Sequence, residues 1–144
     1  MTRRTITILL VITAIVAVVA FTTLKKEKAI EKVLLSDSYS TETGDSAETV
    51  RELNEFESSS DIYAVIMLKN ITPDDSISIQ WKRIEENGEL LIQEDAVIEK
   101  QEGSGPLVIS LAKKNDIHEA GKYKIYVKLN ESEAIEKTFT VKKE

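Results

Sequence analysis

Hydrophobic and polar residues divide the chain into two parts with different patterns. Residues 5–24, from Thr5 to Leu24, form a 20-residue run that contains no charged residue, Gly or Pro. A helix of this length, at ~1.5 Å rise per residue, matches the ~30 Å hydrocarbon core of a bilayer. The run is rich in β-branched residues, but in lipid only a helix pairs the backbone groups of a single segment. The pattern therefore predicts an N-terminal transmembrane helix.

Two fates of this helix are open from the sequence. Its length and the preceding Arg3 and Arg4 fit an uncleaved signal anchor, whereas Val18 and Ala20 fit the small residues before a signal-peptide cleavage site. We favour the anchor, because the apolar run continues past Ala20 to Leu24. The lysines after the run outnumber the arginines before it, which by the positive-inside rule favours a cytoplasmic domain. We nevertheless expect a single-pass cell-membrane protein with its C-terminal part extracytoplasmic, because the short basic N-terminus resembles an export signal.

Residues 25–60 are expected to form a juxtamembrane segment and an acidic, Ser/Thr-rich spacer. Residues 25–35 either prolong the helix or turn extended at Val33 to begin a first strand. The following stretch has Arg51 as its only basic residue, and such a composition buries too little apolar surface to order by itself. We expect it to dock on the domain only at its apolar positions, which are Val50, Leu53 and Phe56.

From residue 61 to residue 144 the pattern changes to the period of two that is typical of strands. We expect strands near residues 62–68, 77–81, 90–98, 107–111, 121–129 and 135–141. Asn87-Gly88 is a hairpin signal because both residues tolerate positive φ, and the Gly-Ser-Gly-Pro of residues 103–106 predicts another turn. Residues 113–120 are polar, and we expect a single helical turn there. The pattern predicts an all-β domain, an antiparallel β-sandwich preceded by one transmembrane helix.

Two motifs resemble immunoglobulin-like (Ig-like) domains. The Ile-Gln-Trp that ends at Trp81, followed about forty residues later by residues 119–125, is similar to the core-tryptophan strand and the tyrosine corner of that family. The resemblance implies that Trp81, Tyr123 and Ile125 are core residues, with the Tyr123 hydroxyl bonded back to the preceding corner and Ile125 in the place of a disulfide cysteine. Because the chain has no Cys, it is most similar to Cys-free Ig-like modules of uncharacterised membrane-anchored prokaryotic surface proteins. The resemblance covers residues 61–144.

Composition narrows the classes of function. The chain carries a formal net charge of −6, and the part after the apolar run carries about −8 because Arg3 and Arg4 precede it. An acidic exterior argues against binding to nucleic acid. The absence of Cys and the presence of a single His argue against thiol chemistry, a His-rich metal site and a Ser-His dyad. We therefore expect no enzyme and assign no catalytic, cofactor-binding or metal site.

Three other possible binding features are better explained as ordinary surface or core residues. His118 lies between acidic loop residues and is expected to be solvated. The carboxylates of Asp61, Asp74 and Asp75 are suitable calcium ligands, but they lack a regular ligand spacing, so we expect surface residues. Trp81 would serve as a sugar-stacking platform only if exposed, and its alternating strand favours the core.

Asn70 and Asn130 begin Asn-x-Ser/Thr patterns, which are N-glycosylation acceptors in an archaeal or eukaryotic setting. Taken with the resemblance, the sequence favours a non-catalytic, membrane-anchored extracytoplasmic Ig-like module for protein interaction or surface presentation. Its expected partners are the lipid bilayer and an envelope protein or polysaccharide. The alternative is a secreted ligand- or carbohydrate-binding domain released by signal-peptide cleavage.

Overall fold

The computed structural model describes residues 27–39, 50–98 and 102–144. The predicted transmembrane helix at residues 5–24 lies outside these residues. Within the described ranges, no helix is long and apolar enough to cross a membrane.

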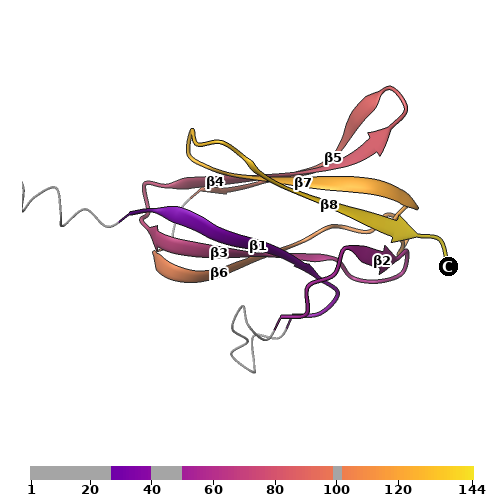
Figure 1. Ribbon diagram of the computed structural model, residues 1–144, viewed down its shortest axis with the longest axis horizontal. Helices are drawn as coiled ribbons and strands as arrows, with labels where there is room; N and C mark the ends of the chain where they lie inside the picture. Colours follow the sequence, from indigo (N-terminus) through magenta and orange to yellow (C-terminus); the bar gives the residue numbers. More distant parts are fainter. Residues whose placement is uncertain (1–26, 40–49, 99–101) are drawn as a thin grey trace, which may run out of the picture.

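Eight described strands form two facing sheets (Figure 1). The strands are β1 (Ala29–Ser36), β2 (Glu55–Glu57), β3 (Tyr63–Ile71), β4 (Ser76–Glu85), β5 (Gly88–Ile98), β6 (Gly103–Ser110), β7 (Gly121–Leu129) and β8 (Ile135–Lys142). One sheet has three strands in the order β1-β3-β6, and the other has five in the order β2-β8-β7-β4-β5. Neighbouring strands are antiparallel except β2 and β8, which are parallel. The all-β sandwich is thus as predicted, with one parallel pairing that the sequence did not indicate.

The core lies between the sheets, where the alternating residues of β4 and β7 point inward. Trp81 and Ile125, which are paired across these two strands, are both fully buried. Phe139 of β8 stacks on the ring of Tyr123 at 5.2 Å between centroids and meets the edge of Trp81 at 6.0 Å. Such aromatic contacts add stabilisation beyond the burial of apolar area.

The described strands begin at Ala29, within the region that the sequence assigned to a juxtamembrane segment and spacer. The extended alternative for this region is the one observed, and β1 starts before Val33. Leu53 is half-buried and Phe56 is buried against the core, as expected of docking positions, and Val50 is half-buried. The hydrophobic pattern did not predict strand β2, because this strand is only three residues long and buries only Phe56.

The β4–β5 hairpin forms where Asn87-Gly88 predicted one, although its turn differs from the expected type. Glu85 pairs with Gly88, so the loop is Glu86-Asn87, and of the Asn-Gly pair only Gly88 has positive φ, at 128°.

Two other loop predictions were wrong. Residues 103–106 do not form a turn but begin β6, and Pro106 is tolerated there because β6 lies at the end of its sheet. Residues 113–120 contain no helical turn: Lys114 and Ile117 form an isolated bridge, and the two residues between them have positive φ. These two residues are Asn115 and Asp116, which are among the few types that readily adopt this conformation.

Candidate functional site

The two ends of the sandwich differ in chemistry. The strand register places Ile77 opposite Leu129 near one end of the five-stranded sheet and Ile84 opposite Lys122 near the other. The first end is called the Asp75 end and contains a polar group formed by Lys28, Thr72, Asp75 and Asn130. The second is called the hairpin end and contains the tip of the β4–β5 hairpin and the loop of residues 111–119. The C-terminus lies at the hairpin end, and β1 begins at the opposite end (Figure 1).

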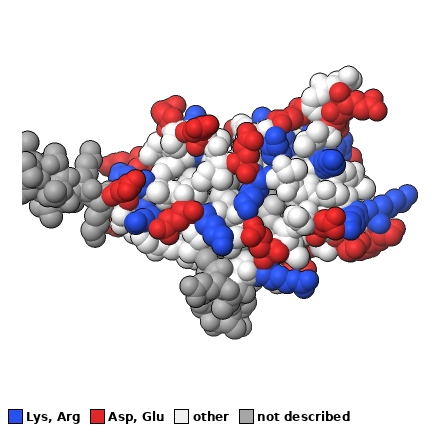
Figure 2. Space-filling view, in the orientation of Figure 1, with Lys and Arg blue, Asp and Glu red and all other residues white. Residues whose placement is uncertain are grey.

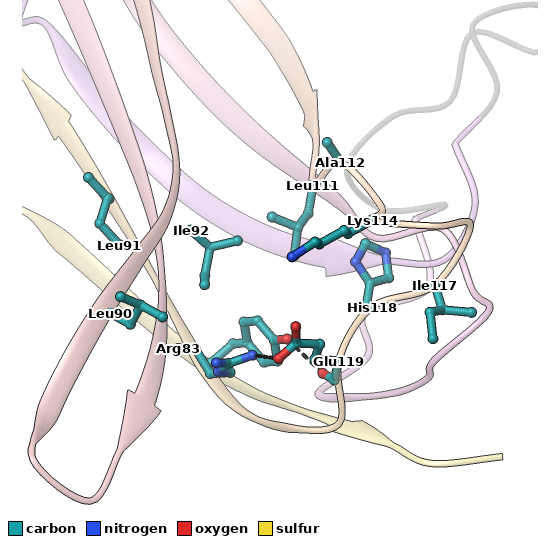
Figure 3. A pocket seen from close by; sticks show the side chains of 11 residues that line it. Arg83, Leu90, Leu91, Ile92, Leu111, Ala112, Lys114, Ile117, His118 and Glu119 are labelled. Carbon is teal, nitrogen blue, oxygen red and sulfur yellow. Dashed lines mark hydrogen bonds and ion pairs between the residues drawn. The ribbon is translucent and has the colours of Figure 1, made fainter.

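The candidate site is a cavity of about 270 Å³ at the hairpin end, shown in Figure 3. The hairpin contributes one wall, and the loop of residues 111–119 contributes the other. The lining residues are Arg83, Leu90, Leu91, Ile92, Leu111, Ala112, Lys114, Ile117, His118, Glu119 and Tyr123.

Apolar exposure distinguishes this site. Leu90, Leu91 and Ile92 are 45%, 47% and 40% exposed, and Ile117 of the facing loop is 47% exposed. Ile92 falls at a bulge, because Trp81 pairs with Gln93 whereas the next residue of β4 pairs with Leu91. The bulge breaks the alternation, and the hairpin tip projects from the sandwich (Figure 1). Acidic and basic side chains are interspersed on the face shown in Figure 2. Apolar exposure rather than net charge therefore singles out the hairpin end.

Gln93 holds the loop wall against β5. Its side-chain amide donates a hydrogen bond to the carbonyl oxygen of Ser110 at 3.0 Å and accepts one from the N–H of Ala112 at 2.8 Å. These two bonds connect the end strand of one sheet to the chain that leaves β6, so the geometry of the cavity depends on this contact between the sheets.

An ion-pair group lines the base of the cavity. Arg83 pairs with Glu85 and with Glu119, and both carboxylates raise the pKa of the guanidinium, Glu85 most strongly. The hydroxyl of Tyr123 donates to the backbone carbonyl oxygen of Glu119 at 2.6 Å, which is the backward bond that the sequence resemblance implied. Burial raises the pKa of Tyr123. The charge of Arg83 is therefore compensated within the protein.

His118 is not the solvated residue that the sequence predicted. Only 4% of His118 is exposed, and its backbone N–H donates to the backbone carbonyl oxygen of Ser58 at 2.8 Å. Nε2 has no hydrogen-bond partner among the described residues. Burial lowers the pKa of His118, and the nearby ammonium of Lys113 lowers it further, so the imidazole is neutral at pH 7. Sequence reasoning missed this burial because the covering segment near Ser58 is sixty positions away in the chain.

Lys114 is the cation of the cavity that lacks an acidic partner. Lys113, its neighbour, pairs with Asp61 at 2.8 Å, and Arg83 is paired as described above. Within the described ranges Lys114 forms no ion pair. Figure 3 shows its side chain reaching from the loop toward the hairpin.

The Asp75 end has the opposite character. The carboxylate of Asp75 is buried and accepts hydrogen bonds from the N–H of Thr72 at 2.8 Å, the amide of Asn130 at 3.0 Å and the ammonium of Lys28 at 3.1 Å. The Thr72 N–H, followed by the Asn130 amide, holds the pKa of Asp75 well below its usual range. Asp61 lies at the hairpin end with Lys113, so the three aspartates considered as calcium ligands do not come together. The described residues contain no group of metal-ligating side chains.

Both glycosylation patterns lie at the Asp75 end. The side-chain oxygen of Asn130 accepts a bond from the N–H of Ser76 at 2.9 Å, while its Nδ2 donates to Asp75. Nδ2 of Asn70 donates to the carbonyl oxygen of Glu27 at 2.7 Å. In both cases the nitrogen that a glycan would modify already has a partner within the fold.

Trp81 has no exposed surface. It therefore offers no platform for stacking a sugar.

The chain matches no protein-family model and no curated protein sequence.

Proposed function

We propose that this protein is a single-pass membrane protein that holds an Ig-like β-sandwich outside the cell as a non-catalytic interaction module. The observation that carries the proposal is the separation of the two ends. The strand that follows the predicted span begins at the Asp75 end, while the cavity with exposed apolar residues lies at the hairpin end. A span at residues 5–24 would then place the hairpin end away from the membrane.

The connection between span and sandwich is short in this proposal. Strand β1 begins at Ala29, five residues after Leu24. Lys28 is bonded to Asp75 at 3.1 Å, and the carbonyl oxygen of Glu27 accepts the bond from Asn70. The first described residues are thus tied to the loops at this end of the domain. Such ties would orient the domain relative to a preceding helix.

The sheet order supports the Ig-like assignment. In Ig-like domains of the constant type one sheet contains strands A, B, E and D, and the other contains G, F and C, with C′ and C″ added in variable-type domains. The orders β1-β3-β6 and β8-β7-β4-β5 correspond to these sets. Strand D has no counterpart among the described strands. Trp81 lies on β4 at the C position and Tyr123 on β7 at the F position, as the family pattern requires. Strand β2 is an additional strand beside β8.

The cavity also supports a role in binding rather than catalysis. General acid–base chemistry requires an ionisable group within hydrogen-bond reach of a nucleophile or substrate. Here Glu119 is committed to Arg83, the Tyr123 hydroxyl is committed to a backbone carbonyl, and His118 is buried. The remaining ionisable group of the lining, Lys114, is exposed and has no neighbouring acid or base among the described ion pairs to act with it. The secreted carbohydrate-binding alternative has less support, because Trp81 is buried.

The test is the location of the domain in cells that express the chain with a C-terminal epitope tag. We expect it to stay in the membrane pellet after alkaline carbonate washing and to lose the tag when protease is added to intact cells. A matched chain that lacks residues 2–24 should remain inside, unattached and protected. Protease protection of the full chain would reverse the orientation, and recovery from the medium with Phe21 at the N-terminus would favour the secreted alternative.

A further inference from the structure

We propose that the outer edge of β5 at the hairpin end accepts an extended segment of a partner protein as an additional strand. An apolar side chain of that segment would enter the cavity, and a carboxylate two residues away, on the same face of the added strand, would meet Lys114. The inference rests on the proposed function of the domain as an interaction module, and it specifies the surface and the chemistry of the partner.

The four end strands of the two sheets differ in how well they could accept another strand. Strand β2 is only three residues long, and β6 contains Pro106, which lacks an N–H. Strand β1 has a bulge at Glu31, and the side chain of Glu31 forms an ion pair with Lys69. Short length, proline, bulges and charges are the usual protections against added strands. Strand β5 also has a bulge, at Ile92, and three acidic residues, but it is 11 residues long, contains no proline and exposes three consecutive apolar residues at the bulge.

The size of the cavity favours a peptide side chain over a larger ligand. Pockets for drug-sized molecules usually measure ~300–1,000 Å³, and this cavity of about 270 Å³ lies below that range. Leu90 and Ile92 line it from β5 itself, and the buried Leu111 lines it from the facing loop. A strand added to β5 directs every second side chain to one face of the sheet. One such side chain would fit between the hairpin and the loop.

Charge indicates what should accompany the apolar side chain. Two of the acidic residues near the hairpin tip already have basic partners: Glu89 is near Lys82 at 3.6 Å and Lys124 at 3.7 Å, and Glu85 pairs with Arg83. Lys114 is the cavity cation that has no acidic partner among the described residues. A carboxylate on the partner strand would form an ion pair with Lys114.

The same charges argue against a second copy of this chain as the partner. Strand β5 contains three acidic residues, Glu89, Glu94 and Asp95, and no basic one. Pairing β5 with β5 of another copy would bring six carboxylates to one seam, and like charges facing each other across strands are destabilising.

The test uses the full-length protein in lipid nanodiscs and a panel of fluorescein-labelled heptapeptides in which apolar and polar residues alternate. The panel varies the central apolar residue and places Asp, Ser or Lys two positions from it, where the side chain lies on the same face of the added strand. Fluorescence anisotropy should show saturable binding, tightest for peptides with Asp. Leu90→Asp should weaken this binding at least tenfold, and Lys114→Glu should reverse the preference from Asp to Lys. N-methylation of the peptide backbone should abolish binding, because it removes the N–H donors of the added strand.

Two matched variants serve as controls. Ile84→Asp introduces the same charge on the same hairpin, and Lys122→Glu inverts another exposed cation, but neither residue lines the cavity. Both variants should bind the peptides as the unmodified protein does.

Absence of saturable binding across the panel would overturn the proposal, as would equal losses in the control variants or indifference to N-methylation. Dimerisation in sedimentation experiments that Leu90→Asp abolishes would assign the surface to a second copy instead. The protease experiment on intact cells does not depend on peptide binding. Failure of this inference is therefore distinguishable from failure of the proposed membrane topology.

Discussion

The Asp75 end and the hairpin end close the same sandwich in different ways. At the Asp75 end a buried carboxylate receives hydrogen bonds from a backbone N–H, an amide and an ammonium. At the hairpin end three consecutive apolar residues of β5 are at least 40% exposed beside a cavity. Buried polar groups persist in proteins when they are hydrogen-bonded, whereas clustered apolar exposure commonly marks an interaction site. The difference shows that polar groups are satisfied within the fold at one end, whereas apolar surface is left exposed at the other.

The largest expected effect comes from removing β1, which links the Asp75 end to the core. Val33 and Leu35 are buried in the core cluster, and each such side chain contributes ~1.5–3 kcal/mol. Domains of this size are stable by only ~5–15 kcal/mol, and β3 would also lose a hydrogen-bonded neighbour. We expect a fragment of residues 27–144 to show cooperative thermal unfolding by circular dichroism. A fragment of residues 37–144 should not, and an equally cooperative transition there would show that β1 is dispensable.

The next largest effect is expected for Asp75→Ala in the 27–144 fragment. The substitution leaves the Thr72 N–H and the Asn130 amide without their acceptor. Hydrogen bonds to charged groups are worth ~1.5–3 kcal/mol each, and partial rehydration offsets part of the loss, so we expect destabilisation of about 3 kcal/mol in urea unfolding. Asp74→Ala changes an exposed neighbouring carboxylate and should cost less than ~0.5 kcal/mol.

Acid should weaken this contribution of Asp75. Its pKa is lower in the folded protein than in the unfolded chain, so its stabilisation is complete above about pH 4 and is lost as the pH falls further. Equal acid sensitivity of Asp75→Ala and the unmodified fragment below pH 4 would contradict this role.

A smaller effect is expected at the hairpin end for Tyr123→Phe. The variant keeps the ring that stacks on Phe139 but loses the bond to the carbonyl oxygen of Glu119. A hydrogen bond of this kind contributes ~1 kcal/mol. Tyr126→Phe removes the exposed bond to Glu89 and should cost less than ~0.5 kcal/mol. Equal urea midpoints for the two variants would show that the corner bond does not stabilise this end.

The smallest effect is expected from the titration of His118. Burial lowers its pKa in the folded protein, so the unfolded chain takes up a proton first as the pH falls below about 6.5. The stability of the fragment should therefore decline between pH 7 and pH 5. His118→Leu should remove this decline, which is assignable because the chain has no other His. If the urea midpoints of His118→Leu and of the unmodified fragment change equally between pH 7 and pH 5, the imidazole is hydrated in the folded protein.

Local patterns predicted the parts of the fold that depend on neighbouring residues. Alternation located β7 at residues 121–129, and Asn87-Gly88 located the β4–β5 hairpin. The same reasoning failed at residues 103–106, because Gly and Pro signal a turn unless an end strand accommodates them. It also missed β2, whose three residues carry too little pattern to distinguish a strand from a loop.

The sequence by itself determined the apolar run at residues 5–24, the alternation of most strands and the inward side of β4 and β7, because these follow from the order of residues along a short segment. Only the tertiary structure decided that Asp75 meets Lys28, 47 positions away, and that His118 is covered. It also decided that the apolar residues of β5 at the hairpin end are exposed, on a strand that ends its sheet. Burial, ion pairing and exposure depend on which distant segments pack together, and a local pattern carries no record of those partners.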